Sequence, residues 1–525
     1  MCTKRVLTAV LTAVALLLPA GASVARSDAP EDPTGLLASD NIEIHTVFPQ
    51  QAAIGARFKG SHMFVTSTAG LVVYDISDPA APEPVGALPL PHFENEDVDL
   101  GGNILLISND AAESYGILYV IDITDPASPR LLAAHDMGGN PLGPVVDAAD
   151  FFGVVPDQMN PGHTASCILE CAFAWVSDAG GMRLIDLRDP QNPARLGNFG
   201  SPAAGSLGIT HDVQTDENGI AWISGFGGVA GYAIPADYAD AVAQAATVGG
   251  SALDEYHKTL LVAATDPNGH SRYAETFGLD DGSTYNDFIL HNSRRLKDSD
   301  VVYVTEEDYS RPGCNGAGSF ETWRLPMREE EDADGNITKV ITGEPMTPLD
   351  KWETELLTDG ADNPSGRPQP TAMCSAHYFD VEQNVVAQGW YEQGLRLLDV
   401  SDPADIRQVG YFIPPNGESW ASYFAPTDPA GRVFYLLDAT LGLVVLEYDR
   451  PVDGPLAIPV CKAKKKGKPS KGCKGQGSSG KGRSSSEEAE RYEPTVVAPV
   501  REEWTTGTPQ SAPSRQFGYA CRIPV

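Results

Sequence analysis

The sequence predicts an all-β protein, a seven-bladed β-propeller with four-stranded blades. One apolar segment recurs along the chain, with a second strand ahead of each copy and a short strand after it. The copies are spaced by roughly 45 residues before insertions, which is typical of propeller blades. The stretch NIEIHTVF from Asn41 has no blade of its own, while the last blade ends after its third strand near Tyr448. Pairing these two segments closes the ring and removes open sheet edges.

Each copy of the repeat is an alternating apolar strand that ends in an Asp-Pro turn. Val, Ile, Leu and Tyr suit a half-buried strand, the Asp can bond the backbone of the turn, and Pro fixes φ. The copies are GLVVYDISDPAAP from Gly70, GILYVIDITDPASP from Gly116, GMRLIDLRDPQNP from Gly181, GLRLLDVSDPADI from Gly394 and a decayed GLVVLEYDRP from Gly442. The segments GGVAGYAI from Gly227 and GSFETWRL from Gly318 take the same position in the fourth and fifth blades without the Asp-Pro turn, which brings the total to seven.

These repeats resemble the LVIVD repeat, whose name paraphrases the strand before the Asp-Pro turn. The resemblance rests on four clear copies and one weak copy. It implies a β-propeller exposed at the cell surface or outside the cell, because that family is known mainly as surface-exposed propellers.

The chain divides into segments of different composition. Residues 1–25 have the layout of a signal peptide, with Lys4 and Arg5 before an apolar run and small residues up to Ala25. A linker (26–40) precedes the propeller (41–453), in which we expect insertions at about 139–161 and 235–284, the second with an Ala-rich helix on one face. A basic Gly/Ser/Lys-rich linker (454–491) and a C-terminal tail (492–525) follow. The linker either contacts anionic envelope polymers, tethering the protein to the cell wall, or is simply solvated.

The charge and the cysteines restrict the partners and the compartment. A net charge of −34 disfavours nucleic acid, and no later segment is long and apolar enough to span a membrane. We expect a secreted or surface-associated monomer that binds a protein, a polysaccharide or a small molecule. Export favours disulfides, with Cys167 and Cys171 clipping a hairpin and Cys314 and Cys374 tying neighbouring blades together. The pairing of Cys461, Cys473 and Cys521 stays open.

Four histidines recur at one register of the repeat. His163, His211 and His291 each precede an aromatic residue of the next strand by eleven or twelve positions, and His377 has the corresponding place in the sixth blade. This register puts them at the start of the innermost strands, near the axis, and in the second blade it falls near Glu96 and Asp97. Imidazoles and a carboxylate suit a transition metal ion. Alternatively, the repeat reuses a histidine to bond the backbone of the neighbouring blade.

Further polar residues stand close to this register. Glu306, Glu307, Asp308 and Tyr309 precede Cys314, and Cys374 stands beside His377. They either line the same mouth of the channel or cap loops.

The sequence supports two functional hypotheses. The first is a binding scaffold that presents loops on a rigid propeller, because neither a G-x-S-x-G elbow nor an H-E-x-x-H helix is present. The alternative is a metal-dependent extracellular enzyme, an oxidoreductase being one option, with the four histidines as ligands.

Overall fold

The computed structural model describes thirteen segments of the chain, and every structural statement below concerns them. They are residues 37–49, 53–90, 95–109, 117–136, 163–178, 181–205, 210–235, 237–265, 289–307, 318–331, 335–354, 375–414 and 417–449. Several sequence predictions fall outside them: the signal peptide, the insertion at 139–161, the two segments after 453, and the residues Asp308, Tyr309, Cys314, Cys374, Cys461, Cys473 and Cys521.

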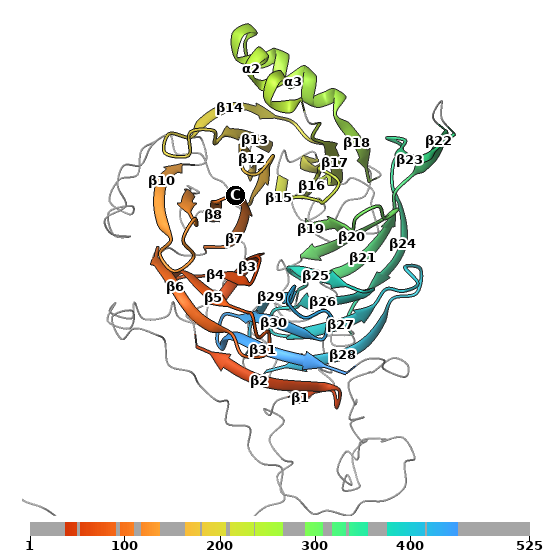
Figure 1. Ribbon diagram of the computed structural model, residues 1–525. Helices are drawn as coiled ribbons and strands as arrows, with labels where there is room; N and C mark the ends of the chain where they lie inside the picture. Colours follow the sequence, from red (N-terminus) through yellow and green to blue (C-terminus); the bar gives the residue numbers. More distant parts are fainter. Residues whose placement is uncertain are drawn as a thin grey trace, which may run out of the picture.

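Seven four-stranded antiparallel sheets surround one central axis, which confirms the predicted seven-bladed propeller (Figure 1). From the axis outward, the first three blades are β3 (Ala53–Lys59), β4 (His62–Ser67), β5 (Gly70–Asp75) and β6 (Glu83–Pro89); β7 (Asp97–Gly101), β8 (Ile104–Asn109), β9 (Ile117–Asp122) and β10 (Arg130–Asp136); and β11 (Ala165–Ile168), β12 (Phe173–Asp178), β13 (Gly181–Asp186) and β14 (Ala194–Phe199). The fourth and fifth are β15 (Thr210–Thr215), β16 (Ile220–Gly225), β17 (Gly228–Ala233) and β18 (Leu261–Ala264); and β19 (Ile289–Arg295), β20 (Val301–Glu307), β21 (Ser319–Arg324) and β24 (Thr347–Trp352). The last two are β25 (Phe379–Glu382), β26 (Val385–Gly389), β27 (Leu395–Asp399) and β28 (Arg407–Ile413); and β29 (Ser419–Phe424), β30 (Val433–Asp438), β31 (Gly442–Tyr448) and β2 (Ile42–Phe48).

The ring closes through the N-terminal strand, as predicted. β2 pairs antiparallel with β31, with Ile42 opposite Tyr448 and Phe48 opposite Leu443. The short strand β1 (Leu37–Ala38) adds a fifth strand to the sixth blade by pairing with β28 (Figure 1). Pairing therefore begins within the segment 26–40, which composition alone marks as a linker. Both strands place the N-terminal part of the chain beside the last two blades.

The Asp-Pro turns have the structure that the repeat predicts. The Asp of each Asp-Pro pair accepts a hydrogen bond from the backbone N–H two residues later, as Asp78 does from Ala80 (3.2 Å) and Asp125 from Ala127 (3.1 Å). Asp189 and Asp402 do the same. The Asp that ends each of these four strands, such as Asp75, accepts a similar bond from the second residue after it. Such Asx turns satisfy the first backbone donor after the strand and stop the ladder.

The hydrophobic core lies between the blades rather than on the axis. One cluster joins Phe64 and Val73 of the first blade to Leu105 and Tyr119 of the second, and similar clusters follow around the ring. Burying a side chain of this size contributes about 1.5–3 kcal/mol. Because the apolar faces are used between sheets, the inner edges are left for polar side chains.

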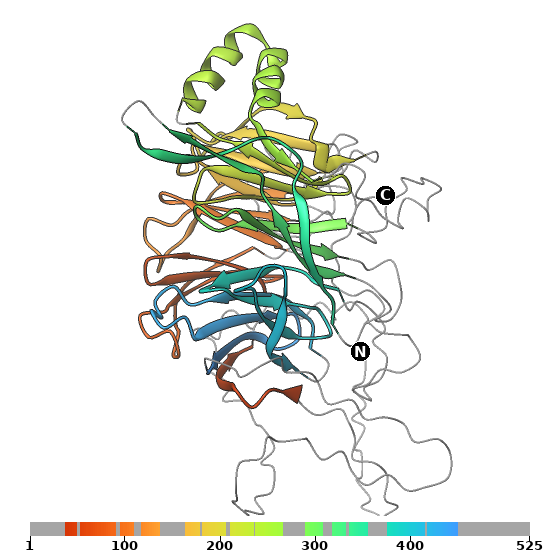
Figure 2. The ribbon, with the colours of Figure 1, turned by 90° about the vertical axis from the view of Figure 1, so that its right-hand side faces the viewer.

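The insertion after β17 lies at the rim of the propeller and not on one of its faces. It forms helices α2 (Tyr238–Val248) and α3 (Gly250–Thr259) outside β14, and the same segment supplies β18, the outer strand of the fourth blade (Figures 1 and 2). A 3-10 turn, η1 (Pro202–Ala204), and a hairpin of β22 (Met327–Glu331) and β23 (Ile337–Ile341) complete the described elements. Among them, no helix has both the length and the apolar character to cross a membrane.

Candidate metal centre on the propeller axis

A β-bulge near the start of the inner strand carries the histidine in the fourth and fifth blades. In β15 the register passes from Thr210 opposite Gly225 to Val213 opposite Ile223, so that His211 and Asp212 together face one partner residue. The same shift occurs in β19. A bulge of this kind re-aims a side chain that would otherwise follow the pleat. The fourth and fifth blades therefore present His211 and His291 through the same backbone feature.

The structure brings together the side chains that the register places near the axis. The rings of His163, His211, His291 and His377 follow one another with centroid separations of 4.1, 4.4 and 4.1 Å. Glu96 completes the circle, with Oε2 3.3 Å from His163 Nδ1 and Oε1 3.5 Å from His377 Nε2. The least buried member, His163, is 8% exposed. The second to the sixth blade thus supply one closed, buried ring of five side chains.

Glu307 adds a second carboxylate to this ring. It lies at the end of β20 and places Oε2 3.6 Å from His211 Nε2 and 3.9 Å from His291 Nε2. The preceding Glu306 instead contacts Lys351, with 3.1 Å between Oε2 and Nζ. Of the acidic residues considered beside the channel, Glu307 joins the histidines and Glu306 does not.

Two buried tyrosines orient the two carboxylates. The Tyr378 hydroxyl donates to Glu96 Oε1 (3.3 Å), and the Tyr391 hydroxyl donates to Glu307 Oε1 (2.5 Å). Tyr378 directly follows a predicted histidine, but the repeat gives no signal for Tyr391. Hydrogen bonds of this type fix the orientation of metal ligands and tune their basicity.

His377 also contacts the backbone of the next blade. Its Nδ1 donates to the carbonyl of Trp420 at 2.9 Å, which leaves the lone pair of Nε2 facing Glu96. Backbone bonding by a repeated histidine and metal binding therefore use different nitrogens of the same ring. A metal-ligating histidine commonly donates its other N–H to a carbonyl in this way.

Burial favours the neutral form of three of the imidazoles. It lowers the pKa of His211 and of His291 well below the usual value, with the neighbouring histidines adding to the effect, and it also lowers the pKa of His377. Burial has the opposite effect on two carboxyl groups beside the ring. It raises the pKa of Asp97, which follows Glu96, to about 6 and that of Asp212, which follows His211, to about 8. Neutral imidazole is the form that binds metal ions.

The separations within the ring match ligands that share an ion. Distances of 3.5, 3.6 and 3.9 Å between ring nitrogen and carboxylate oxygen exceed the 2.7–3.2 Å of an N–H···O hydrogen bond. Two ligands at about 2.1 Å from one ion lie about 3.0 Å apart at a right angle, about 3.4 Å apart in a tetrahedron and about 4.2 Å apart on opposite sides of the ion, and the separations in the ring fall within this range. The ligand atoms of His163, His211 and His291 lie within 4.8 Å of one another, as do those of Glu96, His291 and His377.

Comparison with known proteins supports the repeat assignment. The LVIVD repeat family model matches residues 57–88 and 111–136, which fall in the first two blades. The chain is a β-propeller that contains LVIVD repeats. A search of curated proteins finds no match. Similar solved structures include the β-propeller domain of Cps50 (Swd1) from Myceliophteria thermophila, with 10% identity, 78% of this chain and 99% of that chain covered, and a TM-score of 0.46. The computationally designed Ika8 protein is 11% identical, with 78% and 100% covered and a TM-score of 0.39.

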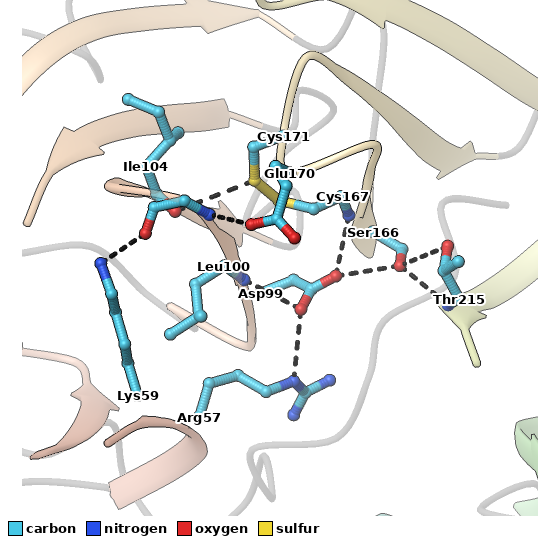
Figure 3. Close-up of a disulfide and its surroundings, with 11 residues drawn as sticks. Arg57, Lys59, Asp99, Leu100, Ile104, Ser166, Cys167, Glu170, Cys171 and Thr215 are labelled. Atoms are coloured by element: carbon cyan, nitrogen blue, oxygen red, sulfur yellow. Dashed lines mark hydrogen bonds and ion pairs between the residues drawn. A yellow bond between two sulfur atoms is a disulfide. The ribbon is translucent and has the colours of Figure 1, made fainter. Parts of the chain in front are cut away.

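The LVIVD-repeat propeller has a different set of residues at the far end of its inner strands. There, Asp99 accepts hydrogen bonds from the Cys167 backbone (2.8 Å) and the Ser166 hydroxyl (2.9 Å), as Figure 3 shows. A disulfide between Cys167 and Cys171 clips the turn between β11 and β12 (Figure 3). An open cavity of about 620 Å³ lies beside this turn, with Lys59 in its lining. The two ends of the axial channel are therefore chemically distinct.

Proposed function

We propose that this LVIVD-repeat propeller is an exported metalloprotein that binds divalent transition metal at the histidine end of its axis. The observation that carries the proposal is the closed ring of four buried imidazoles and Glu96, joined by Glu307. Buried carboxylates and neutral imidazoles together form a donor set for first-row transition metals. The propeller itself is an interaction scaffold in the general sense, and the metal centre gives that scaffold a specific chemistry.

The donor set also favours the enzyme hypothesis. Metal held by histidines and carboxylates keeps coordination positions for water or substrate when the protein supplies only some of the ligands. An ion held by these side chains would supply Lewis-acid chemistry, by lowering the pKa of a bound water or by polarising a substrate oxygen. The side chains of the chain have separate tasks: the histidines and glutamates bind, while Tyr378 and Tyr391 orient the carboxylates.

Two features support export. The first 25 residues have the layout of a signal peptide, and Cys167 and Cys171 form a disulfide. Disulfides persist in oxidising compartments, whereas cytosolic thiols are kept reduced.

A second candidate function, a binding platform for a small polar ligand, is favoured by the cavity at the other end of the axis. Its lining combines Lys59 with Asp99, Glu170 and Thr215, and so offers both donors and acceptors. Its volume of about 620 Å³ lies within the range of small-molecule sites.

Elemental analysis of the secreted protein tests the proposal. The full chain is expressed with its own N-terminus and purified from the medium, and its mass should show the loss of about 25 residues. We expect transition metal in stoichiometric amount, which His211→Ala and His291→Ala each reduce at least tenfold, since each removes a buried ligand.

His45→Ala serves as the control. His45 lies on β2, the outermost strand of the seventh blade, and its Nε2 is 3.0 Å from Oε2 of Glu447 on the adjacent strand β31. It should leave the metal content unchanged. A wild-type protein that stays metal-free after incubation with Mn²⁺, Co²⁺ and Zn²⁺ would leave only the platform function, and an unprocessed chain retained in the cells would contradict export.

A further inference from the structure

We infer that the axial centre holds two metal ions rather than one. This inference rests on the proposed metal binding and specifies its stoichiometry. Its basis is the pairing of carboxylates with imidazoles: each of the two buried glutamates lies between two histidines, and the four histidines are different residues.

The first group is built around Glu96. Its two oxygens diverge, with Oε2 3.3 Å from His163 and Oε1 3.5 Å from His377, although these histidines come from the third and the sixth blade. Tyr378 donates to the same carboxylate. The side chain of Glu96 is fully buried.

The second group repeats this composition around Glu307. Its Oε2 lies 3.6 Å from His211 and 3.9 Å from His291, and Tyr391 donates to its other oxygen. Each group therefore contains two histidines, one glutamate and one tyrosine. Two histidines and one carboxylate form a complete protein ligand set for a divalent metal ion, with open positions left over.

The two groups are in contact on both sides. The rings of His163 and His211 are 4.1 Å apart, and so are those of His291 and His377. Ligand atoms from different groups also come within 4.8 Å of one another, since Glu96 and His377 lie that close to His291. Ions bound to the two groups would be near enough to share a water or hydroxide, as in two-metal sites with ions about 3.5–4 Å apart.

The number of ligands also favours two ions, because six buried side chains with ligand atoms line the centre: His163, His211, His291, His377, Glu96 and Glu307. A single ion held by His163, His211 and His291 would leave Glu96 and His377 as an incomplete second group.

Metal stoichiometry on the full chain tests the inference. The protein is stripped with a chelator, dialysed against Mn²⁺, and analysed for manganese per chain. We expect two ions per chain in the wild type and one in both Glu96→Gln and Glu307→Gln, because each change removes the carboxylate of one group and keeps its size. Glu321→Gln is the matched control: Glu321 is equally buried but lies on β21, next to Trp323 and Lys351, and should keep two ions.

The electron paramagnetic resonance of the Mn²⁺-loaded wild type provides a second readout that needs no variant. Two ions that share a bridge couple magnetically and lose the six-line signal of an isolated Mn²⁺ ion. A wild type with one ion and an isolated signal overturns the two-ion inference while metal binding stands. A wild type with no ion overturns both. A glutamate variant that folds yet loses both ions, or neither, also contradicts the inference.

Discussion

Tyr391 lies at the candidate metal centre in an uncommon backbone conformation. Its φ is +36°, in the left-handed region, and its side chain is fully buried. A non-glycine residue in that region costs of order 1–3 kcal/mol, which persists only where the surroundings fix it. Here the Tyr391 carbonyl accepts from the N–H groups of Gly394 (3.0 Å) and Ser419 (2.9 Å), and the ring packs on His377 and Trp420. We therefore treat Tyr391 as a positioning residue for Glu307.

Tyr391→Phe should weaken metal binding about 10–100-fold without unfolding the protein, because it removes one hydrogen bond to a ligand and keeps the packed ring. Competition with a chromophoric chelator measures the change in affinity. A shift in the visible spectrum of the Co²⁺-loaded variant would show that the ligand has moved, which a purely structural role would not produce. Tyr119→Phe, in a fully buried residue of β9, is the control and should change neither quantity.

Residue identity along the repeat predicts only part of this site. The aromatic residue of the second strand fixes the register, and counting back from it reaches Glu96 and the four histidines. Glu307 lies at the end of the second strand, where this count does not reach, so the sequence left open whether it lines the channel or caps a loop. Tyr391 approaches the centre through its unusual φ, which no local pattern encodes.

Among the elements, the α2–α3 hairpin packs on the rim through apolar side chains such as Val242 and Leu253 and through one buried histidine. His257 Nε2 and the Tyr238 hydroxyl are 2.6 Å apart, and the His257 ring packs on Phe199 (4.0 Å) and Trp175 (4.8 Å) of the third blade. Burial lowers the pKa of His257 to about 3. The folded hairpin therefore holds a neutral imidazole where the unfolded chain would carry a protonated one in mild acid.

The hairpin should loosen as the pH falls below about 6.5. The unfolded state then binds a proton that the folded state binds only near pH 3, so the free energy of unfolding decreases as the pH falls through this window. At pH 5 the loss is about 2 kcal/mol relative to neutral pH. Amide exchange of 237–259 at pH 5 and pH 7, corrected for intrinsic rates, measures it. His257→Phe should flatten this dependence, and an unchanged dependence would contradict the assignment.

Strand prediction succeeded where the repeat is regular. The apolar alternation and the Asp-Pro turns define the third strand of each blade, and even the decayed copies at Gly227 and Gly318 form β17 and β21. The outer strand β18 was assigned to an insertion, because LVAA follows a helical hairpin instead of a turn. Outer strands make fewer contacts in the sheet, and their sequences are correspondingly less constrained.

For the whole molecule, ring closure depends on β2. This strand covers β31 over its full length, from Ile42 to Phe48, whereas β1 contributes two residue pairs to β28. Without β2, the seventh blade would expose the unpaired edge of a long apolar strand.

A mature chain that begins at Gln50 should therefore melt at a lower temperature than the parent and aggregate during heating. A chain that begins at Asn41 loses only β1 and is the matched control, with a melting temperature close to that of the parent. Circular dichroism and light scattering during a thermal ramp measure both properties. Equal melting temperatures for the two truncations would mean that closure contributes little to stability.

The blades that supply the ligands are consecutive, and this order has a mechanical consequence. Glu96, His163, His211, His291 and His377 come from the second to the sixth blade, while the bulges of the first and seventh blades carry Ile54 and Trp420. Among the described residues, the seam between the two ends of the chain thus has no candidate metal ligand. Bound metal would cross-link the second to the sixth blade and leave the β2–β31 pairing without a cross-link. Tension applied to the termini would therefore separate the seventh and first blades first, and unfolding would then pause at the cross-linked blades.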